Sequence, residues 1–390
     1  MSGRSNGTAA PRHADVVIAG ASFSGLAVAR ELGARALLID PRPVGEGQTS
    51  ACAAPVTVLE ALGSRASIQQ AHDELVLHMP GREVRWPLPE PYCTFDYRRC
   101  CLDAHAGARA PVLRGSVQDR RGKTVLTSGG EVRADILIDC TGWRAALAAP
   151  HGARTAGQPR GRRLRCLPFG LEAEVQVGFR PGLHFYFWPE IVRDGYAWVF
   201  PAGTTARVGL LSYSGRSRLG PALDRFLRRL DIPAGPRHGG FLRVDLHPPV
   251  VDGVFVVGDA GGQCLPLTGE GIRTAVWAGR ACGRLVRGVL EGSIGLAEAA
   301  ARYRALVHRQ QRRYRVLFWS ALAVLVLPPR ALGPLAAWVG RTGPLRSFMR
   351  HYWGIFAEAR RDPDQEVLAP LEAKDPHIAA QMPTPRGPAP

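Results

Sequence analysis

Three small residues near the N-terminus have the spacing of a phosphate-binding turn. Gly20, Ser22 and Gly25 follow the predicted strand 15–19 (DVVIA). They precede the run 26–32, in which apolar residues recur at helical spacing. In such a turn the first glycine makes the bend, the middle small residue lets the backbone approach a pyrophosphate, and the last lets the helix pack on the strand. Ser22 stands in place of the usual middle glycine and carries a hydroxyl that can donate to phosphate.

A carboxylate follows at the distance that a ribose contact requires. Asp40 ends the next apolar run, 36–40, twenty residues after Gly20. In dinucleotide-binding units an acid at this place accepts a hydrogen bond from a ribose hydroxyl. Strand, turn, helix and acid occur in the right order, so this segment predicts a bound dinucleotide.

A second glycine-rich segment, 254–275, reads VFVVGDAGGQCLPLTGEGIRTA. We expect a strand over 254–257, then a carboxylate directed at a ribityl chain or pyrophosphate, then a helix over 272–286. The N-terminus of that helix suits the negative charge of a reduced flavin, and glycines before it let a ring lie against bare backbone. Two such segments can grip one FAD molecule. The predicted contacts are Gly258, Asp259, Gly269, Gly271 and Ile272.

These residues resemble a known group of flavoproteins. The stretch GDAGGQCLPLTGEGIRTA is similar to the second flavin motif of p-hydroxybenzoate-hydroxylase-like flavoproteins, and PLTGEGI at 266–272 resembles most their geranylgeranyl reductase branch. Residues 99–103 (RCCLD) resemble the family's FAD-contacting helix, and 139–142 (DCTG) resemble its strand-end turn near the cofactor. The resemblance implies FAD contacts from Arg99 and from the backbone of Val117, at the end of the strand-like run 112–117.

The resemblance also implies where substrate and chemistry lie. In the stretch YAWVFP at 196–201, alternation puts the three aromatic residues on one face of a strand. The family's reductases carry a similar stripe along a prenyl tunnel, although Arg193 stands where they usually have proline. An aromatic face that only packs against the cofactor domain is the alternative. Cys52, in a loop that approaches the flavin in the family, is the candidate catalytic residue. The implied substrate contacts are Tyr196, Trp198, Phe200 and Pro201.

The implied activity is reduction of isolated C=C bonds in a geranylgeranyl- or menaquinone-like prenyl lipid, by hydride transfer from reduced FAD. Two alternatives stay open: an FAD-dependent monooxygenase of a hydrophobic substrate, and a redox-silent flavoprotein such as a cyclase-like isomerase. A flavin halogenase is not expected, because Lys123 and Lys374 are badly placed for its active-site lysine. No second nucleotide fingerprint is present, so NADPH, a reduced ferredoxin or a separate reductase is expected to supply electrons.

These anchors predict an α/β fold in which a Rossmann-type FAD-binding domain is interleaved with a mostly antiparallel β-sheet substrate domain, followed by C-terminal helices. Chain order and domain order therefore differ. The expected parts are a discontinuous FAD-binding domain (1–70, 96–160 and 245–300), the sheet domain (71–95 and 161–244), a helical region (301–360) and a weakly structured tail (361–390).

Composition narrows the class of protein. The formal net charge of +17 comes almost wholly from arginine, and no basic patch interleaved with aromatic residues occurs, so nucleic-acid binding is not expected. The eight cysteines have neither metal-type nor secreted-domain spacing, which indicates a reduced compartment and no metal site. The first 14 residues contain no apolar core of a signal peptide, so we expect a cytoplasmic protein.

A basic and apolar segment near the C-terminus suggests a location on the inner face of a membrane. The apolar run 317–327 has eleven residues, too few to cross a bilayer. Arginines before it could meet an anionic lipid surface while the run dips in. A helix that merely caps the substrate domain is the equal alternative. The arginines are Arg302, Arg304, Arg309, Arg312, Arg313 and Arg315.

Overall fold

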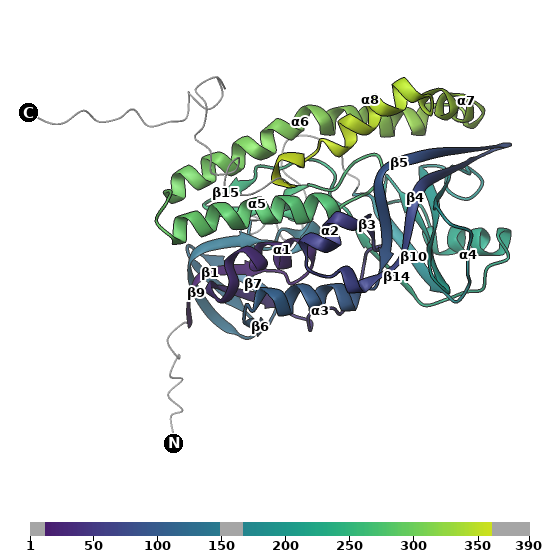
Figure 1. The fold of residues 1–390 in the computed structure, drawn as a ribbon. Helices are drawn as coiled ribbons and strands as arrows, with labels where there is room; N and C mark the ends of the chain where they lie inside the picture. The colour runs from purple at the N-terminus through teal and green to yellow at the C-terminus, as the bar shows by residue number, and fades with distance from the viewer. Residues whose placement is uncertain (1–11, 149–166, 361–390) are drawn as a thin grey trace, which may run out of the picture.

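The computed structural model describes residues 12–148 and 167–360 of the 390-residue chain. Two eight-stranded sheets lie side by side, and the C-terminal helices cross from the first sheet to the second (Figure 1). These helices are α6 (Leu296–Val326), α7 (Pro329–Val339) and α8 (Thr342–Trp353). The predicted α/β class with two sheets and C-terminal helices is confirmed.

The first sheet has a parallel centre. β1 pairs in parallel with β2 and β9, β2 with β6, and β9 with β16, while β15, β7 and β8 add antiparallel edges. Val16 and Ile18 of β1 pack into the core beneath α1 and α5, and Val17 and Ala19 pack into a core on the other face. α5 lies between α1 and α6 (Figure 1). The bounds are β1 (Arg12–Ala19), α1 (Phe23–Leu32), β2 (Ala36–Asp40), α3 (Tyr97–Ala108), β6 (Val112–Arg114), β7 (Val117–Arg121), β8 (Thr124–Thr127), β9 (Gly130–Asp139), β15 (Val250–Val251), β16 (Val254–Val256) and α5 (Ile272–Leu290).

The second sheet runs β14-β10-β13-β12-β11-β4-β5-β3 and is antiparallel except where β11 meets β4. One face packs against helix α4, with Val199, Val208 and Phe226 in the shared core. The other face carries an aromatic cluster that includes Tyr196 and Trp198. The bounds are β3 (Ala53–Pro55), α2 (Val56–Ala61), β4 (Ile68–Met79), β5 (Arg82–Phe95), β10 (Phe169–Val175), β11 (Leu183–Tyr186), β12 (Gly195–Ala202), β13 (Thr205–Ser212), α4 (Leu219–Arg229) and β14 (Arg237–Phe241).

The structure differs from the sequence prediction in two segments. The run 112–117, expected as one strand, forms parts of two: β6 ends at Arg114, where the backbone N–H of Gly115 still donates to the carbonyl of Asp40 in β2, and β7 begins at Val117. The apolar run 317–327 continues α6 instead of starting an element. In the described part of the chain, no helix has the length and apolarity needed to cross a membrane. The predicted tail 361–390 lies outside the described residues.

Candidate functional site

A cavity of about 1110 Å³ joins the two sheets. Its volume lies just above the range of about 300–1,000 Å³ that is usual for ligand sites. It reaches from the ends of the first sheet's parallel strands to the aromatic face of the second sheet, and α6, α7 and α8 close its far side. The predicted site residues that line it are Gly20, Ser22, Asp40, Cys52, Val117, Tyr196, Trp198, Phe200, Asp259, Gly269, Gly271 and Ile272. Those that do not are Gly25, Arg99, Pro201 and Gly258.

The first turn owes its shape to close backbone contacts. Gly20 has a φ of +102°, and a Cβ there would lie 2.2 Å from the carbonyl oxygen of Cys140, so only glycine fits. Gly25 supports this turn from below instead of facing the cavity, because a Cβ there would meet the carbonyl of Gly20. α1 begins at Phe23, and the hydroxyl of its N-cap residue Ser22 lies 3.2 Å from the hydroxyl of Tyr97.

Asp40 is held firmly at the end of β2. Its Oδ2 accepts from the backbone N–H of Ala21 and its Oδ1 from that of Arg42, each at 2.9 Å. A carboxylate has about four acceptor positions, so capacity remains for a ligand hydroxyl. Asp139 differs: it is fully buried, and its oxygens accept from the turn that follows it, including the N–H groups of Thr141 and Leu147. Asp139 is therefore a structural residue of the strand-end turn.

Arg99 lies elsewhere than the resemblance implies. Its side chain is 59% exposed on α3 and pairs with Asp103 one turn on, with Nε 2.8 Å from Oδ1. The phase of α3 turns Tyr97 toward the cavity instead. Two other arginines, Arg42 and Arg144, line the cavity. Sequence reasoning missed them, since neither stands in a motif that distinguishes it in an arginine-rich chain.

The second motif brings a carboxyl group and a helix start to the same cavity. Burial raises the pKa of Asp259 to about 7, although the positive charge of Arg243 lowers it. α5 begins at Ile272, directly after Gly271. Gly258 lies behind this wall, where a Cβ would press on the side chain of Ser24.

These features fit FAD. The N-termini of two helices, α1 at Phe23 and α5 at Ile272, both border the one cavity. Each offers first-turn N–H groups and partial positive charge, suited to a pyrophosphate and to an anionic ring. Between them the walls are small residues such as Gly20 and Gly271.

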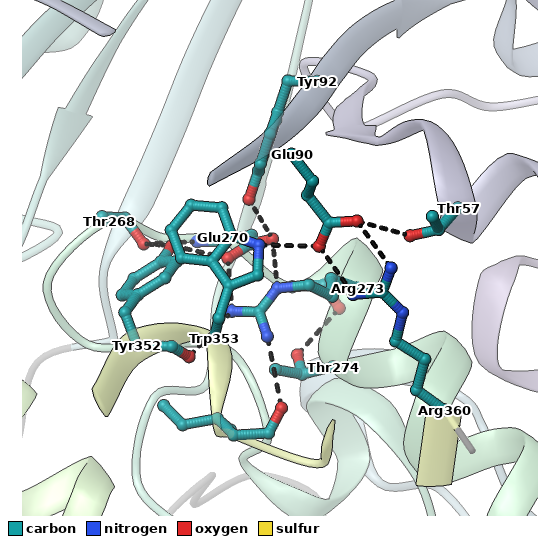
Figure 2. Close-up of polar contacts among 12 residues, drawn as sticks. Thr57, Glu90, Tyr92, Thr268, Glu270, Arg273, Thr274, Tyr352, Trp353 and Arg360 are labelled. Atoms are coloured by element: carbon teal, nitrogen blue, oxygen red, sulfur yellow. Dashed lines mark hydrogen bonds and ion pairs between the residues drawn. The ribbon is translucent and has the colours of Figure 1, made fainter. Parts of the chain in front are cut away.

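A buried polar network lies at the start of α5 (Figure 2). Arg273 holds Glu270 with two bonds, Nε to Oε1 and Nη2 to Oε2, each 2.9 Å. Tyr92 donates to Oε1 at 2.8 Å, and Tyr352 donates to Oε2. Burial alone would raise the pKa of Glu270, but Arg273 and these hydrogen bonds hold it below its ordinary value. Glu270 is thus a fully satisfied anion in the cavity wall.

A second carboxylate, Glu90, forms a separate polar network beside the first (Figure 2). Arg360 binds Glu90 with two bonds of 2.9 Å, and Trp353 and Thr57 also donate to Glu90. Together the two networks fasten the chain around α8 to β5 and α5. Sequence reasoning missed both, because their members are far apart in the chain.

The aromatic stripe borders open space. Tyr196, Trp198 and Phe200 all line the cavity, together with Phe185 from the neighbouring strand. Tyr196 donates to the carbonyl of Thr268, in the glycine-rich loop. The stripe therefore does more than pack against the first domain. Pro201 points its carbonyl elsewhere, accepting from Thr94 in the core.

Cys52 is buried and lines the cavity with a φ of +49°. Burial raises the pKa of its thiol well above the ordinary value. The thiol donates weakly to the carbonyl of Ser50, with 3.4 Å between Sγ and O. Cys52 is therefore a neutral thiol at neutral pH.

Helices α6 and α7 form both a cavity wall and an apolar surface. Val324, Leu332 and Leu335 line the cavity, and Leu335 is also 40% exposed, so the cavity borders the surface there. We use the term apolar surface for the exposed apolar residues of α7 and of α6 from Val316 onward: Val316, Trp319, Leu322, Val326, Leu335 and Trp338.

The arginines before the apolar run do not all face outward. Arg302 is buried and pairs with Glu298, and Arg313 donates to the carbonyl of Gly354 beside α8. Both therefore serve the fold, which corrects the expectation of six surface arginines. Arg312 and Arg315 are exposed near the apolar surface.

Comparison with known proteins gives relatives but no matching family model. A digeranylgeranylglycerophospholipid reductase of Methanoculleus marisnigri is 34% identical over 187 residues, which are 44% of this chain and 45% of the relative. One of Methanosphaerula palustris is 28% identical over 354 residues, or 77% of this chain and 85% of the relative. The alignment thus spans less than half of the first relative.

Solved structures share the fold. A geranylgeranyl bacteriochlorophyll reductase-like protein of Thermoplasma acidophilum has a TM-score of 0.74 at 21% identity, covering 89% of this chain and 98% of the other. The p-nitrophenol 4-monooxygenase PnpA of Pseudomonas putida has a TM-score of 0.68 at 14% identity, covering 90% and 99%. The resemblance seen in the sequence is confirmed: the chain is similar to curated digeranylgeranylglycerophospholipid reductases and has the fold of FAD-dependent oxidoreductases.

Proposed function

We propose that this chain is an FAD-dependent oxidoreductase that reduces isolated C=C bonds of a prenyl lipid by hydride transfer from reduced flavin. The observation that carries the proposal is the continuity of one cavity from the two glycine-rich turns to the aromatic and aliphatic walls formed by β12, α6 and α7. The curated relatives named digeranylgeranylglycerophospholipid reductase support the choice of a prenyl lipid.

The FAD would be held by the two turns. Backbone N–H groups at the start of α1 suit its pyrophosphate, Asp40 suits a ribose hydroxyl, and the start of α5 suits the anionic ring. When bound and reduced, FAD supplies the hydride. NADPH, a reduced ferredoxin or a separate reductase would supply the electrons to the flavin.

The chain's own contribution is alignment and exclusion of water. An unactivated alkene is a poor hydride acceptor, so the reacting carbons must be held in close register with the donor. Tyr196, Trp198 and Phe200 offer flat apolar surfaces for an isoprenoid chain, and Leu75, Leu77 and Val324 extend the apolar wall. The long cavity suits a chain of several isoprene units better than a compact aromatic ring.

Monooxygenation is the second candidate, because PnpA shares the fold and the FAD motifs would serve both reactions. A redox-silent isomerase is the third. The apolar character of the cavity is compatible with all three, so product mass must decide among them.

We further propose peripheral contact with a membrane. The apolar surface of α6 and α7 lies beside exposed Arg312 and Arg315, and Leu335 connects it with the cavity wall. This pattern is suited to an anionic bilayer surface. A lipid chain could then enter the cavity without crossing water.

The test is anaerobic reduction of the flavin-loaded protein with dithionite, addition of a geranylgeranyl lipid or a menaquinone, and mass spectrometry of the product. A gain of hydrogen pairs without oxygen is expected. Oxygen gained only in a parallel sample opened to air would identify a monooxygenase, and activity that never requires reduced flavin would identify the isomerase.

A matched pair of variants connects the reaction to the cavity. Ala336 of α7 lines it and Ala337 does not. Ala336→Trp should obstruct the apolar half and lower product formation at least tenfold while flavin content stays unchanged. Ala337→Trp should keep the wild-type rate. Equal rates in the two variants would contradict the proposed substrate channel.

A further inference from the structure

Four residues stand in one row across the second sheet. His238 of β14 pairs with Glu172 of β10, Glu172 pairs with Gly209 of β13, and Gly209 pairs with Trp198 of β12. β14 is the edge strand of the sheet, and Trp198 lies in the aromatic wall of the cavity. The row therefore leads from the sheet edge to the cavity.

Glu172 is the centre of the row. The indole Nε1 of Trp198 donates to its Oε2 at 2.9 Å, and Nε2 of His238 lies 3.0 Å from its Oε1. The indole reaches Glu172 by crossing Gly209, where a Cβ would lie 2.2 Å from the ring. Only glycine at 209 leaves room for this contact.

A proton path needs one group at the buried site and one that solvent can reach, and the row provides both. The side chain of Glu172 is 3% exposed and lines the cavity, whereas that of His238 is 21% exposed. Apart from His238, no described residue donates to Oε1 of Glu172. A buried carboxylate oxygen without another donor is costly to leave unpaired, so His238 is the partner that satisfies Oε1.

The other carboxylic acids among the described cavity residues lie at other parts of the cavity or are already paired. Asp40 accepts two backbone N–H groups at the dinucleotide end. Asp259 lies beside the start of α5, and Glu270 is held as an anion by Arg273. Phenols of the wall, such as Tyr92, are weaker acids whose pKa burial raises further. Glu172 is left as the acid beside the aromatic wall.

The electrostatic surroundings favour the protonated form of His238. The charged groups that face it are Glu172 from β10 and Arg207 from β13. The hydrogen bond with Glu172 raises the pKa of His238, against burial and the repulsion of Arg207. The imidazolium form therefore persists to higher pH than in a free histidine, and it is lost as pH rises through that raised value.

We infer that His238 and Glu172 form a proton relay that supplies the acid for C=C reduction, with Glu172 as the catalytic acid and His238 as the residue that recharges it. The inference rests on the proposed function. With hydride supplied to one alkene carbon by the bound, reduced cofactor, the other carbon would form its C–H bond with a proton that passes from the His238 imidazolium to a carboxylate oxygen of Glu172 and from there to the carbon. The step leaves Glu172 as a carboxylate beside a neutral His238, which recovers its proton from water.

The first test measures the pair without any turnover. Ring-labelled histidine NMR of the full-length protein would follow the titration of His238, assigned by its loss in H238Q. The midpoint should lie above the ordinary value of about 6.5 and should fall in Glu172→Gln, which keeps an acceptor for Trp198. An equal midpoint in both proteins would overturn the relay.

The second test follows one anaerobic turnover of the dithionite-reduced, flavin-loaded protein with a geranylgeranyl lipid. A general acid contributes about 10²- to 10⁴-fold, so E172Q should slow product formation at least 100-fold. H238Q should flatten the fall in rate at high pH, and added imidazole should restore part of the rate. Glu174→Gln is the control, because Glu174 follows two residues later on β10 and does not line the cavity.

The outcomes separate the two proposals. A wild-type rate in E172Q would overturn the relay while leaving the reductase intact, and so would an equal loss in E174Q. A wild-type protein that titrates as expected but reduces no lipid would overturn the proposed function and with it the delivery step. A slow E172Q together with the shifted His238 midpoint would support both.

Discussion

Glu270 and Arg273 form a buried, bidentate ion pair at the N-terminus of α5, with both N···O distances 2.9 Å (Figure 2). Arg273 also donates to the carbonyl of Ile355, and Glu270 accepts from Tyr92 and Tyr352. The pair thus joins the glycine-rich loop to β5 and to the end of α8. It couples the shape of the predicted flavin site to the placement of the helices that close the cavity.

Breaking this pair should destabilise the whole protein. Glu270→Ala leaves the guanidinium of Arg273 buried and uncompensated, so the free energy of unfolding should fall by about 3–5 kcal/mol. The exposed pair between Glu60 and Arg65 is the control, and Glu60→Ala should cost less than about 1 kcal/mol. Urea unfolding would measure both. Equal, small losses would show that the buried pair contributes no more than a surface one.

Two glycines near the same indole should respond oppositely to alanine. Gly209→Ala places a Cβ 2.2 Å from the ring of Trp198 and must displace it, so we expect about 1–3 kcal/mol of destabilisation and a changed product rate. Gly170→Ala places its Cβ 3.8 Å from the same ring, which is ordinary contact. Thermal unfolding with near-UV circular dichroism would compare them. A tolerated G209A would mean that the indole need not cross the strand.

The stability of the flavin-free protein should depend on Asp259 and pH. Its folded pKa of about 7 lies above that of the unfolded chain, so its contribution is full at low pH and is lost as pH rises toward 7. Asn at position 259 cannot titrate. The free energy of unfolding of Asp259→Asn, measured relative to that of the wild type, should therefore rise by roughly 2–4 kcal/mol from pH 4 to pH 8. Urea unfolding at both pH values tests this. A constant difference between the two proteins would argue against a buried, titrating carboxyl.

The apolar surface should control binding to lipid. Replacing Trp319, Val326 and Trp338 by serine removes its most exposed members and should abolish flotation with vesicles of mixed neutral and anionic phospholipid. Leu102 and Leu296 are exposed hydrophobic residues outside this surface, and their replacement by serine is the control. Binding that survives the triple change, or that fails equally in the control, would contradict membrane contact through α6 and α7.

Local patterns were sufficient for the strands, turns and helices of the cofactor half. The apolar runs at 15–19 and 36–40 became β1 and β2, and the helix expected from Ile272 begins there. Alternation also put Tyr196, Trp198 and Phe200 on one face. These features depend on neighbours in sequence, since strand alternation, helix period and glycine turns are local properties of the backbone.

Which side chains meet was decided by tertiary structure. Arg99 stands in a motif, yet the phase of α3 turns it to solvent. Glu172, His238 and Trp198 carry no motif, and they meet only because the registers of β10, β14, β13 and β12 align them in one row. The sequence by itself therefore determined the cofactor class and the order of the elements. The walls of the cavity, and the acids that face it, were decided by long-range strand register and helix docking, because both depend on the whole core.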